Sequence, residues 1–479
     1  MTELADQNAE ILRAALATGR VSPPEILAAC IERIEALNPL LRAFVATRVD
    51  EARAETTRIA ARDDAASLHG LPVAVKDLND VAGLPTTFGS PLFAGNRPEA
   101  DDDVVAQLRR RGGVVLGKTN VPEHGFGATT TNPLFGSTAN PFDPALSAGA
   151  STGGGAVAVA AGMAPYATGS DFAGSLRTPA AFCGIAGHRP SNGIVGTRRR
   201  ANAWSAFDVE GPMARCAADC KRLLAAMARP DPRDPLSIAP DARLFAPPGT
   251  VPLRGLRVAV SEDLGFAPIC DAYRALFRDR IARIAHLFGA LEHAAPNLSG
   301  AEACFMTLRG VGFVADFGPM EAEFGERLGP VVLDELARAR GLTCAEIGRA
   351  EQEHTRIYRD AVSFFEGHDL LITPAASVPP FPHEDVYPRE MDGRPLDGYL
   401  TWEAIAWGIT LTQCPATVIP CGRDAAGLPF GLQLVGPHGK DGWLLDVAHT
   451  LETAFRGDAT LARPVPDTAG LAEMSATAR

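Results

Sequence analysis

Apolar side chains near the start of the chain recur at helical spacing. Between residues 9 and 37 they return every three or four positions, which is the repeat of an amphipathic helix. Ser22 followed by Pro23 is a helix-start signature, with serine at the N-cap and proline in the first turn. The pattern predicts two amphipathic helices, the second of which begins at Ser22.

Further along, short apolar runs are bounded by turn residues. These runs cover residues 71–76, 113–117, 254–260, 369–373 and 416–419. Runs of this kind are typical of strands that are buried on both faces of a sheet. A helical pattern from about 103 to 111 separates the first two runs, and a helix of small residues is expected over about 155–163. The alternation predicts an α/β fold.

The second half of the chain is less regular. Residues 265–365 have a mainly helical pattern, and a proline-rich loop follows at 379–394. This region either shapes a substrate site or partner surface, or forms a helical layer over the sheet. The last residues, rich in Ala, Pro and Asp, predict a loosely held tail.

Charge narrows the class of partner. The 479 residues carry a formal net charge of −12, with an isoelectric point near 5.4. A surface that binds nucleic acid or an anionic membrane needs an excess of Lys and Arg, so neither partner is expected. Small neutral or cationic molecules fit this charge better.

Cysteine usage and the N-terminus indicate the compartment. The nine cysteines are odd in number and scattered, which suits reduced thiols better than a disulfide framework. Cys216 and Cys220 are one helical turn apart but lack a second Cys/His pair, so we expect no metal there. The acidic first residues lack the basic and apolar regions of a secretory leader. We expect a cytoplasmic protein.

Two serines framed by glycines carry the main chemical clue. Ser151 lies in a block of small residues at 148–156, and Ser175 follows Gly174. Glycines allow the backbone to approach a substrate closely, and a serine becomes nucleophilic when a base and oxyanion donors surround it. The pattern predicts a serine hydrolase. The alternative is that both serines only cap turns.

Two motif matches point elsewhere. Residues 112–119 satisfy the P-loop expression, but the predicted strand lies between its glycines and Pro122 leaves little room for the following helix. Residues 149–153 match the nucleophile elbow of α/β-hydrolases, yet two prolines occupy the place of the preceding strand. We reject both readings.

No histidine lies in a motif that would mark it as the base for a catalytic serine. The histidines occur singly, without the spacing of a metal site or a catalytic triad, so no metal is expected. Lysine can replace histidine as the base for a serine. Lys76 and Lys118 both end apolar runs, and position alone does not choose between them.

Several blocks together resemble the amidase signature enzymes, which use a Ser–cis-Ser–Lys triad. The resemblance spans roughly residues 20 to 455 and is weakest between 260 and 365. It implies one α/β/α domain with a large mixed sheet covered by helices. The blocks that carry it are 71–77, 118–123, 132–136, 140–141, 148–156, 169–190, 211–215, 373–374 and 427–436.

On this resemblance we expect the catalytic domain to cover residues 1–460. N-terminal helices would occupy 1–65, core segments 66–260 and 366–460, and a variable, mostly helical segment 261–365. The remaining residues, 461–479, are expected to be a flexible tail.

Carried over by position, the resemblance makes Ser175 the nucleophile, Ser151 the bridging serine on a cis peptide bond, and Lys76 the base. It thereby selects Lys76 over Lys118. Lys76 must be neutral to accept a proton at pH 7, which burial can arrange because desolvation disfavours the ammonium form.

The oxyanion hole would use backbone N–H groups of Phe172, Ala173, Gly174 and Ser175, and the expected supporting residues are Thr152, Gly153, Asp171 and Arg177. The chain departs from the family pattern, which usually has glycine at 150 and 173, serine at 152, and Thr or Ile at 172. Here these positions are Ala150, Ala173, Thr152 and Phe172. Phe172 would narrow the acyl pocket.

The expected activity is hydrolysis of a small linear amide through an acyl-Ser175 intermediate, without a cofactor, and esters are further candidate substrates. The sequence leaves the oligomeric state open, and a homodimer is one candidate. One alternative is the glutaminase subunit of a tRNA-dependent amidotransferase, but the segment Arg177-Thr178-Pro179 lacks the glutamine that this subunit usually carries before the proline. Another is a catalytically inactive binding protein.

Overall fold

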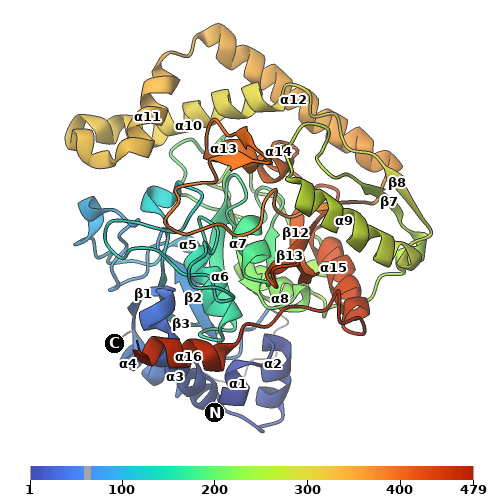
Figure 1. Cartoon of the computed structure of the whole chain (residues 1–479). Coiled ribbons are helices and arrows are strands. Elements are labelled where there is room, and N and C mark those ends of the chain that lie inside the picture. The colour runs from blue at the N-terminus through green and yellow to red at the C-terminus, as the bar shows by residue number, and fades with distance from the viewer. Residues whose placement is uncertain (1, 59–65, 478–479) are drawn as a thin grey trace.

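One large mixed sheet organises the chain (Figure 1). A computed structural model describes residues 2–58 and 66–477, and within these ranges the sheet has eleven strands. In spatial order they are β1 (Phe44–Thr47), β3 (Val114–Thr119), β2 (Pro72–Lys76), β4 (Tyr166–Asp171), β6 (Val209–Ala214), β5 (Ala186–Arg189), β12 (Ala416–Arg423), β13 (Pro429–Val435), β9 (Leu370–Pro374), β7 (Arg257–Val260) and β8 (Ala290–His293).

The strand directions change along the sheet. β2 is parallel to both of its neighbours, β3 and β4. From β4 through β6, β5, β12 and β13 to β9 each pair is antiparallel, and the β9–β7–β8 edge is parallel again. The predicted α/β fold with a mixed sheet is confirmed.

Helices cover both faces of this sheet. α6 (Gly153–Ala160) and α7 (Arg177–Phe182) pack on one face, and α8 (Ala217–Met227) packs with α15 (Asp441–Phe455) on the other. Successive residues of a strand point to opposite faces of the sheet, and two residues of β5 show which helix lies on each face. A Cβ on Gly187 would meet α7 at 2.8 Å from the Cβ of Ala180, whereas the ring of the next residue, His188, lies 3.1 Å from Asp441 of α15. The sheet centre is therefore buried on both sides.

The N-terminal helices match the sequence prediction. α2 (Ala9–Ala17) and α3 (Pro23–Leu41) form the two amphipathic helices, after the short α1 (Thr2–Ala5) and before α4 (Val49–Thr56). Ser22 caps α3, and Glu25 completes a capping box by accepting from the Ser22 N–H at 2.8 Å. The expected N-terminal segment 1–65 extends into residues 59–65, which lie outside the described ranges.

The second half contains the helical region that the pattern predicted. In Figure 1, α10 (Ala301–Phe324), α11 (Pro330–Arg340) and α12 (Cys344–Gly367) lie along the top, at the opposite end of the molecule from α1–α4. Beneath them lie α13 (Tyr399–Trp402) and α14 (Ala404–Leu411), and α9 (Asp271–Ile284) lies beside β9. The proline-rich loop includes a small hairpin of β10 (Glu390–Met391) and β11 (Arg394–Pro395).

Helix α5 (Asp103–Arg110) lies between β2 and β3 in the chain, as the pattern predicted. The short 3₁₀ helices are η1 (Pro91–Phe93), η2 (Glu123–Gly125), η3 (Ala242–Phe245), η4 (Leu253–Gly255), η5 (Ala285–Leu287) and η6 (Gly325–Leu328).

Two of the strands that the apolar pattern did not predict, β4 and β5, are rich in small and polar residues. β4 includes Thr168, Gly169 and Ser170, and β5 includes Gly187 and His188. Isolated segments of this composition have weak strand propensity. They are strands here because neighbouring strands and the helices on both faces bury every one of their residues.

The prediction of a flexible tail over 461–479 is wrong for most of that segment. Residues Thr468–Thr477 form α16, which packs against α3 and carries Leu471 at 5% exposure into the main core. The composition of the segment is loop-like, and the apolar surface that holds it comes from a helix more than 400 positions earlier in the sequence.

All nine cysteines are free thiols, and each is buried except Cys344. Among the helices that the structure describes, none combines the length and the apolar character needed to cross a bilayer.

Replacing Leu471 with alanine tests the docking of α16. We expect Leu471→Ala to lower the free energy of unfolding by about 2 kcal/mol, because it removes buried methyl groups from the contact with the core. Urea unfolding followed by circular dichroism measures the loss. Met474→Ala is the control, since Met474 is 48% exposed on the same helix. Equal effects of the two substitutions would show that α16 is not held by Leu471.

Candidate active site

Lys76 lies at the end of β2 and is fully buried. Its Nζ is 2.7 Å from Ser151 Oγ and 3.0 Å from Ser170 Oγ, both within hydrogen-bond distance. Burial lowers the pKa of Lys76 to about 8, although the negative charges of Asp208, Glu210 and Asp171 oppose the shift. A lysine in this state can accept a proton near neutral pH.

The second candidate lysine has a different environment. Lys118 Nζ lies 2.8 Å from Asp77 Oδ1 and donates to Thr86 Oγ1 at 2.8 Å, and both charged side chains are buried. A carboxylate partner favours the charged ammonium. In the part of the chain that the structure describes, no salt bridge joins Lys76 to a carboxylate, so the geometry separates the two lysines.

Ser151 follows a cis peptide bond, between Ala150 and Ser151. The turn that precedes it is tightly packed: a Cβ on Gly149, at φ +75°, would come within 2.9 Å of the Cα of Pro179. Thr130 Oγ1 holds this turn, since it donates to the Gly149 carbonyl at 2.8 Å and accepts from the Gly153 N–H at 3.2 Å. Gly153 thus begins α6 and helps to position Ser151.

Ser175 lies in the loop between β4 and α7 and is half-buried. The backbone N–H of Thr152 donates to the Ser175 carbonyl at 3.2 Å, so the segments that carry the two serines lie against each other. Lys76, Ser151 and Ser175, which the resemblance assigned to one triad, therefore come from neighbouring segments at one end of the sheet.

Asp171 organises the loop that carries Ser175. Its carboxylate accepts from the N–H groups of Gly174 and Leu176 at 3.0 and 3.1 Å, and from Arg177 Nε and Nη2 at 2.9 Å each. Burial acts to raise the pKa of Asp171, but the guanidinium groups of Arg177 and Arg189 hold it well below its usual range. The loop is thus closed around a permanent negative charge.

Arg177 also ties this loop to the C-terminal part of the chain. The side chain is fully buried and donates to the Ala406 carbonyl at 2.6 Å, Gln433 Oε1 at 2.7 Å and Thr410 Oγ1 at 3.1 Å. Together with the two bonds to Asp171, these contacts use all five N–H donors of the guanidinium, so Asp171 and Arg177 both have a structural part in holding the loop.

The expected oxyanion donors differ in availability. The Gly174 N–H is already paired with Asp171, whereas the N–H groups of Phe172, Ala173 and Ser175 have no acceptor among the described residues. Gly174 takes a φ of +122°, which favours glycine, and Ala173 keeps a negative φ that suits alanine. In this structure three of the four expected donors are unpaired, and Gly174 shapes the loop through its bond to Asp171.

Two features near the serines were missed by sequence reasoning. Ser170 binds Lys76, and its signal was its place beside Asp171 in a block that carried the family resemblance. The turn at η2 also reaches the site, because a Cβ on Gly125 would lie 3.8 Å from Ser151 Oγ. Nothing in the local pattern of residues 123–127 indicates that contact.

The structure agrees with the rejection of the P-loop and of the nucleophile elbow. β3 runs through Lys118 and Thr119, where a P-loop would begin its helix, and no strand of the described chain leads directly into Ser151. Among the described residues, no three His, Cys, Asp or Glu side chains gather as a metal ligand set.

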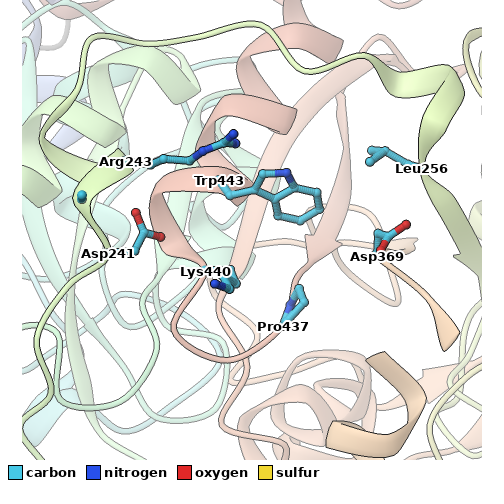
Figure 2. A pocket seen from close by; sticks show the side chains of 8 residues that line it. Asp241, Arg243, Leu256, Asp369, Pro437, Lys440 and Trp443 are labelled. Carbon is cyan, nitrogen blue, oxygen red and sulfur yellow. The ribbon is translucent and has the colours of Figure 1, made fainter. Parts of the chain in front are cut away.

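A surface cleft of about 540 Å³ lies apart from these residues (Figure 2). It contains none of the serines or lysines described above. Its lining residues are Asp241, Ala242, Arg243, Leu256, Asp369, Pro437, Lys440 and Trp443.

Known proteins are similar to this chain over most of its length. The Amidase family model matches residues 25–445. An acylamidase of Rhodococcus erythropolis is 33% identical over 448 residues, covering 92% of this chain and 94% of the relative. The A-type subunit of the glutamyl-tRNA(Gln) amidotransferase of Chloroflexus aurantiacus is 35% identical over 475 residues, covering 93% and 96%.

Solved structures show the same fold. A bacterial aryl acylamidase of the amidase signature enzymes superposes with a TM-score of 0.85 at 23% identity, covering 98% of both chains. Three findings lead to one conclusion. The family model matches most of the length, the relatives align over nearly the whole chain, and the sheet is the same. The chain belongs to the amidase signature family and is an amidohydrolase, an enzyme that cleaves the C–N bond of amides.

Proposed function

We infer that this enzyme hydrolyses small linear amides with Ser175 as the nucleophile, Ser151 as the proton relay and Lys76 as the base. The observation that carries the proposal is the 2.7 Å contact between Lys76 Nζ and Ser151 Oγ in a fully buried setting, beside the loop of Ser175. A nucleophilic serine needs such a base within hydrogen-bond reach.

In the acylation step, neutral Lys76 accepts the proton of Ser151 while Ser151 accepts the proton of Ser175. Ser175 Oγ then forms a bond to the amide carbonyl carbon, and the carbonyl oxygen becomes an oxyanion. The free N–H groups of Ala173 and Ser175, with that of Phe172, are the donors available to this charge. They are held in place by the loop that Asp171 organises.

The intermediate breaks down when the C–N bond cleaves. The proton held on Lys76 returns through Ser151 to the leaving nitrogen, which departs as ammonia or an amine. Water then attacks the acyl-Ser175 ester and gives a proton to Lys76 along the same relay. The bond between the acyl carbon and Ser175 Oγ breaks, Ser175 takes that proton back through Ser151, and the carboxylic acid leaves and ionises to its carboxylate. Carboxylic esters can follow the same route, so they are further candidate substrates.

A second candidate is the glutaminase subunit of a tRNA-dependent amidotransferase, which the 35% identity to the Chloroflexus protein favours. Against it stands Thr178, the residue directly before Pro179, where that subunit usually has glutamine. Hydrolysis of simple amides by the purified chain alone supports the amidase. Activity confined to glutamine in the presence of a partner would favour the glutaminase.

Substitution of each triad residue tests the roles. We expect Ser175→Ala, Ser151→Ala and Lys76→Ala each to lower kcat/KM for an amide by about a thousandfold or more, because residues that act as one unit lose most of the rate together. Ammonia release measures the rate, and a fluorophosphonate followed by peptide mass spectrometry locates the nucleophile.

Ser363→Ala is the control for this series, since Ser363 is exposed on α12. Label on Ser175, lost in Ser175→Ala, agrees with the proposal. Label on Ser151 together with full activity of Ser175→Ala would contradict it.

The pH dependence follows from the state of Lys76. Its pKa of about 8 means that the neutral base becomes more abundant as pH rises, so kcat/KM should rise between pH 6 and 9 with an inflection near 8. Asp208 raises the pKa of Lys76, so Asp208→Asn should move the inflection to lower pH.

A pH–rate profile of each variant checks this prediction, with Glu366→Gln, an exposed residue of α12, as the control. A profile that is flat from pH 7 to 9, or an inflection that Asp208→Asn moves upward, would exclude Lys76 as the titrating base.

A further inference from the structure

A buried acid faces the serine that contacts the lysine of the site. In the antiparallel pair of β4 and β6, Ser170 and Glu210 are directly opposite each other. Side chains in that relation point to the same face of the sheet, with their Cβ atoms about 5 Å apart. Ser170 Oγ is 3.0 Å from Lys76 Nζ. Only the hydroxyl of Ser170 therefore separates Glu210 from the base.

The carboxylate of Glu210 is fixed through one oxygen and free at the other. Its Oε1 accepts from Asn79 Nδ2 at 3.0 Å and from Arg199 Nη1 at 2.9 Å, and Arg199 is itself held by Asp102 at 3.2 Å. Glu210 is 4% exposed, and no group of the described residues donates to its Oε2. A buried oxygen without a donor is costly, so Oε2 is an acceptor that lacks only a hydrogen.

Asn79 provides a second acceptor of the same kind. The side chain is fully buried, and its Oδ1 has no donor in the part of the chain that the structure describes. Because Asn79 Nδ2 is bonded to Glu210, the two unpartnered oxygens lie on neighbouring groups. One water molecule can donate its two hydrogens to such a pair, and its oxygen then accepts the hydroxyl hydrogen of Ser170.

The direction of the Ser170 hydroxyl decides whether the base is available. A neutral lysine has two N–H donors and one lone pair. To take the proton of Ser151, the lone pair of Lys76 must face Ser151 Oγ, which is 2.7 Å away. A hydroxyl of Ser170 that donated to Lys76 would occupy this lone pair. When the hydroxyl donates towards Glu210 instead, Ser170 only accepts an N–H from Lys76.

We propose that Glu210 is a positioning residue that turns the hydroxyl of Ser170 away from Lys76, so that the lone pair of the neutral lysine is directed at Ser151. This assignment rests on the proposed function, because it needs Lys76 as the base and Ser151 as the relay. No bond to Glu210 forms or breaks in the reaction. Its part is to fix the direction of the hydrogen bonds around the base, as an acid does behind a catalytic histidine.

The negative charge of Glu210 has a separate effect on the same lysine. Asp208, Glu210 and Asp171 raise the pKa of Lys76, and Arg199 lowers it. Removing the charge of Glu210 therefore moves the inflection of the pH–rate profile to lower pH, whether or not the acid orients a hydroxyl. The orientation acts on the rate above that inflection, where the lysine is already neutral. The pH-independent plateau of kcat/KM is thus the quantity that isolates it.

A double-mutant cycle measures this plateau, with hexanamide as substrate and ammonia release as the readout. Glu210→Gln keeps the acceptor for Arg199 and Asn79 but puts an amide NH₂, which is a donor, in place of Oε2. We expect it to lower the plateau by about tenfold. In a Ser170→Ala background the same change should alter the plateau by less than about twofold, because no hydroxyl is left to orient.

Two further variants separate geometry from charge and from folding. Glu210→Asp keeps the charge but withdraws the carboxylate by one methylene, so it should lower the plateau and leave the inflection near 8. It also provides the test if Glu210→Gln does not fold. Asp446→Asn is the matched control, since Asp446 is an acid at 6% exposure on α15 that is paired with Lys221 at 2.7 Å. It should leave the plateau unchanged.

An unchanged plateau in both Glu210 variants, or a loss in Glu210→Gln that is equally large in the Ser170→Ala background, would overturn the assignment. Either result leaves the amidase standing as long as Ser175→Ala and Lys76→Ala remain inactive. Full activity of Lys76→Ala would instead remove the proposed function itself.

Discussion

The buried ion pair between Asp171 and Arg177 is the interaction on which the rest of the site depends. Asp171 closes the Ser175 loop through two backbone N–H groups, and Arg177 connects the same loop to α14 and β13. Both side chains are completely buried. A buried charge is tolerated only when it is paired and hydrogen-bonded, so this pair holds together segments more than 200 residues apart.

Burial sets the chemistry of the lysine. Lys76 and Lys118 lie on adjacent parallel strands, and both are buried. Lys118 has a carboxylate at 2.8 Å, whereas the polar contacts of Lys76 are with hydroxyl and carbonyl groups. Burial lowers the pKa of both lysines, but the adjacent Asp77 opposes that shift for Lys118, whereas the pKa of Lys76 falls to about 8. What differs is the side chain that faces each ammonium group.

The chemistry and the surroundings of the substrate come from different parts of the fold. The nucleophile loop, the relay turn and the lysine belong to the central strands, where the family resemblance is strongest. α10 belongs to the segment where it is weakest, yet its aromatic residues reach both Phe172 and Phe126. A helix laid over a fixed site can change what the site accepts without changing how it reacts.

The sequence by itself determined the local elements and the residue types of the site. Apolar periodicity predicted α3 and β2, because each buries a continuous face. The two serines were recognisable from the glycines that flank them in the sequence. The tertiary structure alone decided that α16 docks on α3, that Asp171 occupies the Gly174 N–H, and that Phe126 meets α10. Each of these depends on a partner brought close by folding, and local patterns carry no information about such a neighbour. The pKa of Lys76 is of the same kind, since burial and the placement of distant carboxylates set it.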